Sequence, residues 1–168
     1  MRLSNVRSNK LRVVAVSGGF DPIHEGHIDY LKAAAKLGYP SRVVVILNSD
    51  RFLKKKKGKA FMSLKERKKI LEAIKYVDSV FISIDKDQTV GASLERLRPD
   101  IFAKGGDRNI KNIPQDEIDV CRKYGIKMKF GVGGKKVQSS SWLLNNYVQD
   151  VQTKENHIRR GRSSDRSR

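Results

Sequence analysis

Short apolar runs alternate along the chain with segments whose apolar residues recur at helical spacing. The length of these runs, their flanks and their β-branched residues predict strands. The five predicted strands cover residues 11–16, 42–47, 80–84, 101–103 and 126–130. The predicted helices cover residues 25–37, 63–75, 90–97, 114–124 and a last segment that begins at residue 139.

The order of these elements indicates the fold class. Strands and helices alternate at lengths that suit right-handed βαβ crossovers, and the run Val43-Val44-Val45-Ile46 is apolar enough for a strand covered on both faces. We therefore predict an α/β fold, a Rossmann-like, doubly wound, parallel five-stranded sheet with helices on both faces. In such a sheet ligands bind beyond the carboxyl ends of the strands.

Composition predicts one domain with two flanking segments. A chain of 168 residues with 38% hydrophobic residues fits one globular domain, which we assign to residues 11–150. We expect residues 1–10 to be a flexible N-terminal segment. Residues 151–168 are a basic tail whose end carries no apolar residue, so we expect it to be disordered. A solvated tail is the simpler interpretation, and contact with RNA or acidic lipid is the alternative.

Net charge and cysteine content indicate which partners the protein can bind and in which cell compartment it is expected. Lys and Arg number 36 against 18 Asp and Glu, a net charge of +18 that attracts nucleotides, nucleic acid or an acidic membrane surface. Cys121 is the only cysteine, which excludes an internal disulfide and a cysteine-rich metal site. The chain has no apolar run of about 18 residues and no secretory signal at Met1, so we expect a soluble, cytoplasmic protein without a membrane span.

The segment with the most specific chemistry follows the first predicted strand. Residues 17–27 are Ser-Gly-Gly-Phe-Asp-Pro-Ile-His-Glu-Gly-His and include two of the chain's three histidines, His24 and His27. A glycine-rich turn from strand to helix directs backbone N–H groups and the positive end of a helix dipole at one point, which suits a phosphate. Imidazoles placed there can contact the same phosphate. A tight turn with a structural histidine is the alternative.

This pattern resembles the signature of the nucleotidyltransferase family that includes glycerol-3-phosphate cytidylyltransferase, heptose-phosphate adenylyltransferase and the pantetheine and nicotinate mononucleotide adenylyltransferases. The resemblance implies catalytic roles for His24 and His27 at the α-phosphate, with Mg²⁺ as a cofactor that arrives with the nucleoside triphosphate. Asp21 either holds the loop or approaches the metal-bound phosphates, and no protein ligand of the metal is assigned. The nucleotide contacts implied in this segment are Gly18, Gly19, Phe20, Asp21 and Gly26.

Four consecutive lysines form a second candidate segment. Residues 54–57 follow the second predicted strand and precede Gly58, and we predict a cationic loop that swings over the site. Lysines at the matching place in glycerol-3-phosphate cytidylyltransferase bind phosphates, so the resemblance implies catalytic roles for Lys55 and Lys57. A merely solvated face is the alternative.

Two later segments resemble nucleotide-binding parts of the same family. Residues 104–108 look like the Lys-Gly-Gly-Asp segment of the heptose-phosphate adenylyltransferases, with Arg108 where the cytidylyltransferase has a tryptophan near the base. Residues 138–141 resemble the Ile-Ser-Thr-Thr segment that binds the β- and γ-phosphates, with simple N-capping as the alternative. The nucleotide-binding residues implied here are Lys104, Gly105, Gly106, Asp107, Arg108, Ser139, Ser140 and Ser141.

The resemblance extends to the helix predicted after Ser63. It implies that Asp50 and Arg67 contact the substrate or the dimer interface, and that the chain forms a homodimer. We predict transfer of CMP or AMP from CTP or ATP to a small phosphorylated alcohol (glycerol phosphate, a polyol phosphate or a sugar phosphate), with release of pyrophosphate.

Three other functions compete with this prediction. A pantetheine- or mononucleotide-type adenylyltransferase is disfavoured because the arginine that commonly follows the serine segment in mononucleotide enzymes is missing after Ser141. A basic nucleic-acid-binding module is disfavoured because only 7% of the residues are aromatic and none alternates with basic residues along a strand. A class I aminoacyl-tRNA synthetase would need a longer chain for its further domains.

Overall fold

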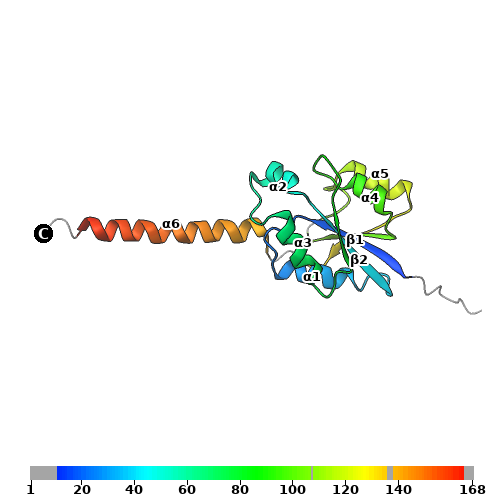
Figure 1. The fold of residues 1–168 in the computed structure, drawn as a ribbon, viewed down its shortest axis with the longest axis horizontal. Coiled ribbons are helices and arrows are strands. Elements are labelled where there is room, and N and C mark those ends of the chain that lie inside the picture. The colour runs from blue at the N-terminus through cyan, green and yellow to red at the C-terminus, as the bar shows by residue number, and fades with distance from the viewer. Residues whose placement is uncertain (1–10, 107, 136–137, 165–168) are drawn as a thin grey trace, which may run out of the picture.

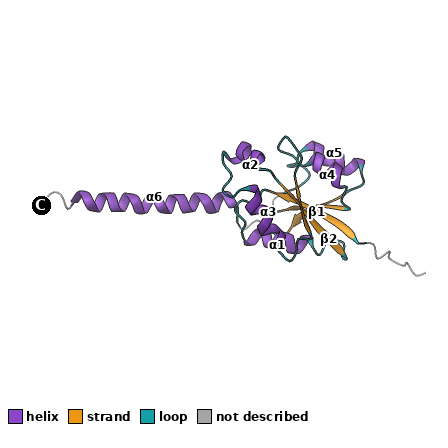
Figure 2. Ribbon diagram, in the orientation of Figure 1, coloured by secondary structure: helices purple, strands orange, loops and turns teal. Residues whose placement is uncertain are grey.

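The computed structural model describes residues 11–106, 108–135 and 138–164. Five parallel strands form one sheet in the order β3-β2-β1-β4-β5, with helices on both faces (Figures 1 and 2), so the predicted fold class is confirmed. The strands are β1 (Arg12–Gly18), β2 (Ser41–Leu47), β3 (Ser79–Ile82), β4 (Ile101–Gly105) and β5 (Lys127–Val132). The helices are α1 (Glu25–Ala34), α2 (Asp50–Lys57), α3 (Leu64–Glu72), α4 (Gly91–Leu97), α5 (Gln115–Lys123) and α6 (Ser140–Ser164).

β1 lies at the centre of the sheet because its side chains are apolar toward both faces. Val16 is level with Val45 of β2 and with Ala103 of β4. Val14 and Val16 belong to the core on one face and Ala15 to the core on the other, and all three are fully buried. This position places the end of β1, where the glycine-rich turn begins, in the middle of the carboxyl edge of the sheet.

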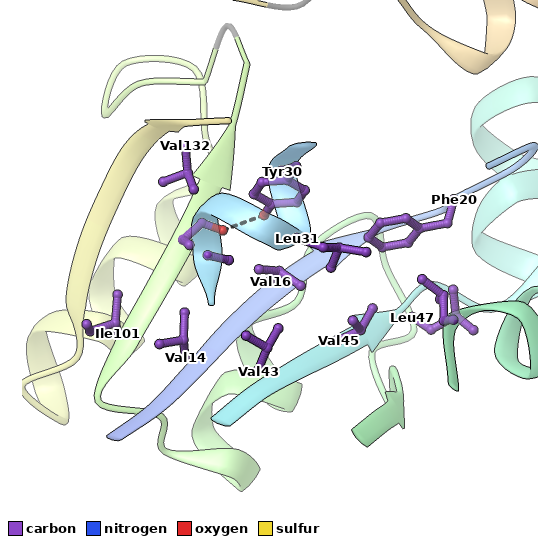
Figure 3. Packing of buried hydrophobic residues seen from close by; sticks show 13 residues of the cluster. Val14, Val16, Phe20, Tyr30, Leu31, Val43, Val45, Leu47, Ile101 and Val132 are labelled. Carbon is purple, nitrogen blue, oxygen red and sulfur yellow. Dashed lines mark hydrogen bonds between the residues drawn. The ribbon is translucent and has the colours of Figure 1, made fainter. Parts of the chain in front are cut away.

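One face of the sheet packs against α1 and α3. Tyr30 of α1 and Leu71 of α3 join Val14 and Val16 in this core, part of which Figure 3 shows. The hydroxyl group of Tyr30 donates a hydrogen bond of 2.6 Å to the carbonyl oxygen of Ala103 (dashed in Figure 3). The bond satisfies a buried polar group and ties α1 to β4 near the edge of the sheet where the site lies.

The opposite face is covered by α4 and α5. Ala15, Ile46 and Phe102 from three strands pack there with Leu94 of α4 and Cys121 of α5. Burial raises the pKa of the Cys121 thiol to about 11, so this cysteine is a packing residue and not a reactive thiolate.

The lysine run is helical, which corrects the prediction of a cationic loop over residues 54–57. α2 begins after Ser49, whose hydroxyl oxygen accepts a hydrogen bond of 3.2 Å from the backbone N–H of Phe52. Lysine is a good helix former, and the buried side chains of Phe52 and Leu53 anchor the helix to the domain. Gly58, with a φ of 81°, ends it in a conformation that glycine adopts without strain.

α6 differs from the expected tail. We predicted a disordered segment from residue 151, but α6 continues to Ser164 and runs away from the sheet as a single long helix (Figure 1). Its sequence contains no proline, and the Leu, Gln, Lys, Glu and Arg residues along it favour helix. The predicted N-terminal segment 1–10 and residues 165–168 lie outside the described residues. Within the described ranges, no helix is both long and apolar enough to cross a membrane.

Candidate functional site

A cavity of about 850 Å³ opens at the carboxyl edge of the sheet, where a doubly wound fold binds its ligands. The predicted site residues that line it are Gly18, Gly19, Phe20, His24, Gly26, His27, Lys57, Lys104, Gly105, Gly106, Arg108, Ser139, Ser140 and Ser141. Four predicted residues, Asp21, Asp50, Lys55 and Arg67, do not line it. Asp107 lies outside the described residues.

The glycine-rich turn brings backbone close to the cavity. A Cβ atom added to Gly19 would lie 2.7 Å from Cδ2 of Leu53, and one added to Gly26 would lie 3.2 Å from the His24 ring. These glycines therefore allow α2 and the first histidine to approach the turn without a side chain between them. The side chain of Phe20 in this turn is buried in the core together with residues of α1.

The two histidine rings stack at the start of α1. Their centroids lie 3.8 Å apart with an interplanar angle of 29°. The backbone N–H of His24 donates a hydrogen bond of 3.3 Å to Nδ1 of His27. Burial, together with the positive charges of His24 and Lys57, lowers the pKa of His27 to about 3. His27 is therefore neutral, accepts at Nδ1 and carries its proton on Nε2, the nitrogen with which it can donate to a ligand.

Lys57 is a cation near enough to His27 to lower the pKa of that ring. Its Nζ donates a hydrogen bond of 3.0 Å to the carbonyl oxygen of Asp21, and burial lowers its pKa against the opposing effect of the Asp21 carboxylate. Lys56 also lines the cavity, whereas Lys55 is exposed outside it. In a helix successive side chains point in directions about 100° apart, so the four lysines cannot all reach one site. Of the two lysines predicted to act at the site, Lys57 lines the cavity and Lys55 does not.

Asp21 is a structural residue of the turn. Its carboxylate is buried and accepts hydrogen bonds of 2.9 Å and 2.7 Å from the backbone N–H groups of Phe61 and Met62. Of the two predicted roles, holding the loop is the one that this geometry supports. The carboxylate ties the segment before α3 to the glycine-rich turn, and it does not face the cavity.

Arg67 is fully buried, which corrects the expectation that it contacts the substrate or a second subunit. Its guanidinium donates to the carbonyl oxygens of Gly19 and Asn48 at 2.8 Å each and to that of Met62 at 3.2 Å. It also pairs with the Asp50 carboxylate at 2.5 Å, so Asp50 is engaged with α3. Arginine has five N–H groups that donate hydrogen bonds, so it suits this central position. Arg67 joins the ends of β1 and β2 to α3.

The segment after β4 places a buried ion pair at the cavity. Lys104 Nζ lies 2.7 Å from a carboxylate oxygen of Glu117 in α5, and both side chains are largely buried. Burial lowers the pKa of Lys104, while the Glu117 carboxylate opposes that shift. Arg108 is exposed and donates to the carbonyl oxygen of Asn112 at 3.0 Å. Glu117 gave no signal in the sequence, because only the packing of α5 brings it to Lys104.

The three serines lie at the N-terminus of α6. Ser139 Oγ accepts a hydrogen bond of 3.1 Å from the backbone N–H of Trp142, so it caps the helix, as the alternative interpretation held. Ser140 Oγ donates to the carbonyl oxygen of Pro22 at 2.9 Å and joins α6 to the glycine-rich turn. The N-termini of α1 and α6 therefore open on the same cavity and concentrate N–H groups and positive dipole ends there.

Several lining residues were missed by the sequence analysis. Gly133, Gly134 and Lys135 follow β5 and repeat the arrangement of glycines beside a lysine seen after β4, a signal that could have been used. Asn48 after β2 and the exposed Gln88 before α4 have no such signal. They reach the cavity because β2 and β3 are neighbours in the sheet.

Comparison with known proteins finds relatives that are similar in sequence. Bifunctional protein HldE of Blochmanniella floridana is 41% identical over 113 residues, which are 66% of this chain but 23% of that protein. FAD synthase of Pyrococcus horikoshii is 40% identical over 101 residues, 60% of this chain and 66% of that protein. The match therefore spans about a quarter of the length of this HldE relative.

A solved structure is similar over most of the chain. The lipopolysaccharide core biosynthesis protein of Thermoplasma volcanium GSS1 aligns with a TM-score of 0.60 and 26% identity over 73% of this chain and 95% of that one. The resemblance inferred from the histidine motif is thus matched in sequence and in fold. A family model described as cytidylyltransferase-like matches residues 15–164, and the chain belongs to the cytidylyltransferase-like family.

Proposed function

We propose that the chain transfers a nucleoside monophosphate from ATP or CTP to the phosphate of a small phosphorylated alcohol. The observation that carries this proposal is the convergence of two helix N-termini, the stacked histidines and Lys57 on one cavity. A phosphate oxygen of the acceptor attacks the α-phosphorus. The bond between that phosphorus and the bridging oxygen breaks, and pyrophosphate leaves with the electron pair.

Each group has a distinct part in this reaction. The serine N–H groups at the start of α6 and the turn after β1 hold the triphosphate. His27 donates from Nε2 to an α-phosphate oxygen while neutral, and Lys57 offsets the charge that spreads over the equatorial oxygens. The protein needs no nucleophile of its own, because positioning and charge stabilisation are sufficient for this chemistry.

Mg²⁺ enters this proposal with the triphosphate. Among the described residues, no group of three or more His, Cys, Asp or Glu side chains could hold a metal ion. We therefore assign the ion no set of protein ligands among the described residues, and phosphate oxygens and water would be its main ligands. When bound, the ion would neutralise charge on the phosphates.

The relatives favour ATP as the donor. The segment from Lys104 in this chain resembles that of the heptose-phosphate adenylyltransferases, and another relative is named FAD synthase, an enzyme whose product contains an AMP unit. The same FAD synthase relative favours a second candidate, an adenylyltransferase that acts on a mononucleotide. The two candidates share the donor site and differ in the acceptor.

Pyrophosphate release tests the proposal. We expect release with ATP or CTP, Mg²⁺ and a phosphorylated polyol or sugar, and none without the acceptor. His27→Ala should lower kcat/KM at least about a hundredfold, because it removes the imidazole that donates to the α-phosphate oxygen. Lys55→Ala, on the exposed side of α2, is the matched control and should retain activity. No release with any triphosphate and any phosphate monoester would contradict the proposal.

A further inference from the structure

The ion pair between Lys104 and Glu117 differs from the other ion pairs of the described residues. In each of the others at least one side chain is exposed to solvent. The side chains of Lys104 and Glu117 are only 11% and 4% exposed, with Nζ 2.7 Å from a carboxylate oxygen. A buried charge stays ionised only when it is paired, so neither group can lose its partner without cost.

A buried carboxylate is unexpected in a cavity that we propose to bind a triphosphate. Among the described residues, the acidic side chains that line the cavity belong to Asp29 and Glu117. Asp29 is exposed, so water and ions screen its charge, whereas Glu117 is buried. An unpaired carboxylate at this depth would repel phosphate. The ammonium group of Lys104 cancels that repulsion at short range, so the pair adds no net charge to its corner of the cavity.

Two neighbours fix the position of the Lys104 ammonium group. Nζ donates a hydrogen bond to Glu117 and lies 4.6 Å from the centroid of the buried Phe102 ring, a favourable contact between a cation and an aromatic face. A lysine side chain is otherwise flexible, so these contacts restrict where its hydrogens point. An ammonium group has three N–H donors, and the bond to Glu117 uses one of them. Lys104 lines the cavity and can direct another donor at a ligand there.

The core of the domain fixes Glu117 in turn. Glu117 lies in the first turn of α5, and Cys121 follows it by one helical turn on the same face. Cys121 is buried and packs in the core that contains Phe102 of β4. The face of α5 that carries Glu117 is therefore held against the sheet. The ion pair thus transmits the fixed position of α5 to Lys104 at the end of β4.

The groups around Lys104 leave Glu117 as the one that keeps it charged. Burial lowers the pKa of Lys104, Glu117 opposes that shift by its charge and its hydrogen bond, and Arg108 lowers the pKa further. Burial raises the pKa of the Cys121 thiol to about 11, so the thiol is neutral near pH 7. Burial, with the Glu117 charge as a lesser cause, also raises the pKa of Tyr30 in α1, so its hydroxyl group is neutral too.

We propose that Glu117 is a positioning residue of the cavity, which holds the ammonium group of Lys104 charged and directed at the bound nucleotide. Lys104 then meets the nucleotide as a directed hydrogen-bond donor, and Glu117 acts only through Lys104. This inference rests on the proposed nucleotidyl transfer and adds a residue to its donor site.

A double-mutant cycle tests whether Glu117 acts through Lys104. Calorimetry measures the Kd of a non-hydrolysable ATP or CTP analogue with Mg²⁺ for the full chain, for Glu117→Gln, for Lys104→Met and for the double variant. We expect Glu117→Gln to raise the Kd about tenfold in the unchanged chain and not to raise it in the Lys104→Met background. Glu95→Gln, which removes the partner of the exposed Lys123, is the matched control and should leave the Kd unchanged. Equal increases in both backgrounds overturn the inference.

The pH dependence of binding separates positioning from a purely structural role. Without the carboxylate, burial acts unopposed on Lys104, so the ammonium group loses its proton at lower pH. We expect the Kd of Glu117→Gln to rise between about pH 7 and about pH 9 by at least about threefold more than that of the unchanged chain. Titration of the nucleotide phosphates is common to both proteins and cancels in the comparison. Parallel pH profiles overturn the inference.

A conservative variant keeps the test decisive if Glu117→Gln does not fold. Glu117→Asp retains the charge but withdraws it from Lys104 by one methylene group. It should raise the Kd by about threefold, less than Glu117→Gln, and leave the pH profile flat. Urea unfolding checks that each variant is folded, and an unchanged Kd in a folded Glu117→Asp overturns the inference. Failure of the unchanged chain to bind any analogue contradicts the proposed function and this inference together, whereas binding without coupling between the two residues overturns the inference alone.

Discussion

At the residue scale, hydrogen bonding decides which chemical form of a side chain meets the ligand. The spacing of His24 and His27 indicated a phosphate site but did not reveal their protonation. Burial selects the neutral form of His27, and the hydrogen bond from the His24 backbone N–H to Nδ1 places the ring's proton on Nε2. Lys57 adds to this effect because a second positive charge so close to the ring is unfavourable.

The low pKa of His27 predicts how stability depends on pH. The folded chain resists protonation of this ring down to about pH 3, while the unfolded chain takes up the proton near 6.5. The unfolded state therefore binds more protons between these values, and the free energy of unfolding falls as pH drops through that range. His27→Gln should flatten this fall in urea titrations, with Lys32→Ala as control. A ring that titrates near pH 6.5 in nuclear magnetic resonance would contradict the prediction.

Arg67 predicts a large loss of stability at a position outside the cavity. Arg67→Ala removes four hydrogen bonds and leaves buried carbonyl oxygens without donors, so we expect the unfolding free energy to fall by about 3 kcal/mol. Urea unfolding measures this. Lys69→Ala, exposed on the same helix, should change it by less than about 0.5 kcal/mol. Equal effects of the two variants would show that Arg67 does not join the elements.

At the scale of elements, the predicted strands and most helices follow from local pattern. The apolar runs that became β1, β2 and β4 are buried on both faces, and such runs have few alternatives to a central strand. The lysine run was predicted to be a loop because it follows a strand and precedes Gly58. Phe52 and Leu53, which precede the lysines, are too short an apolar pattern to predict a helix. Their burial against the domain stabilises α2.

The loop between β5 and α6 gives a prediction at this scale. Gly133 has a φ of 89°, and a Cβ atom there would lie 2.8 Å from Cα of Tyr30 in α1. Gly133→Ala should therefore force the loop away from α1 and lower the unfolding free energy by at least about 2 kcal/mol. Gly131 has a φ of 65° with no atom within 4 Å of the added Cβ, so Gly131→Ala measures the backbone strain alone. Equal losses of unfolding free energy in the two variants would mean that the close approach of Gly133 to α1 does not affect stability.

At the scale of the whole molecule, a basic α/β domain carries one long helix that leads away from it (Figure 1). The start of α6 belongs to the cavity, through the serines of residues 139–141. The rest of the helix extends past the edge of the domain. Its two ends therefore differ in their importance for the site.

This difference predicts the effect of shortening the chain. Removal of residues 155–168 should change the unfolding free energy of the domain by less than about 0.5 kcal/mol and leave nucleotide binding intact, because packing on the sheet supplies most of the stability. Removal of residues 139–168 should abolish nucleotide binding, since it deletes the N-terminus of α6. Calorimetry with an ATP analogue measures both. A loss of more than about 2 kcal/mol on the shorter truncation would show that the distal part of α6 packs on the domain.

The sequence by itself determined the α/β alternation, the strand-to-helix turn with its two histidines, and the glycine and serine segments that the turn would meet. These features depend on neighbours within a few residues, where propensity, capping and dihedral preference act. The tertiary structure alone decided that Asp21 and Arg67 brace the site, that Lys56 and not Lys55 faces it, and that Asn48 and Glu117 belong to it. Those outcomes depend on which strands become neighbours and on how far each helix is rotated against the sheet, and packing between distant segments sets both.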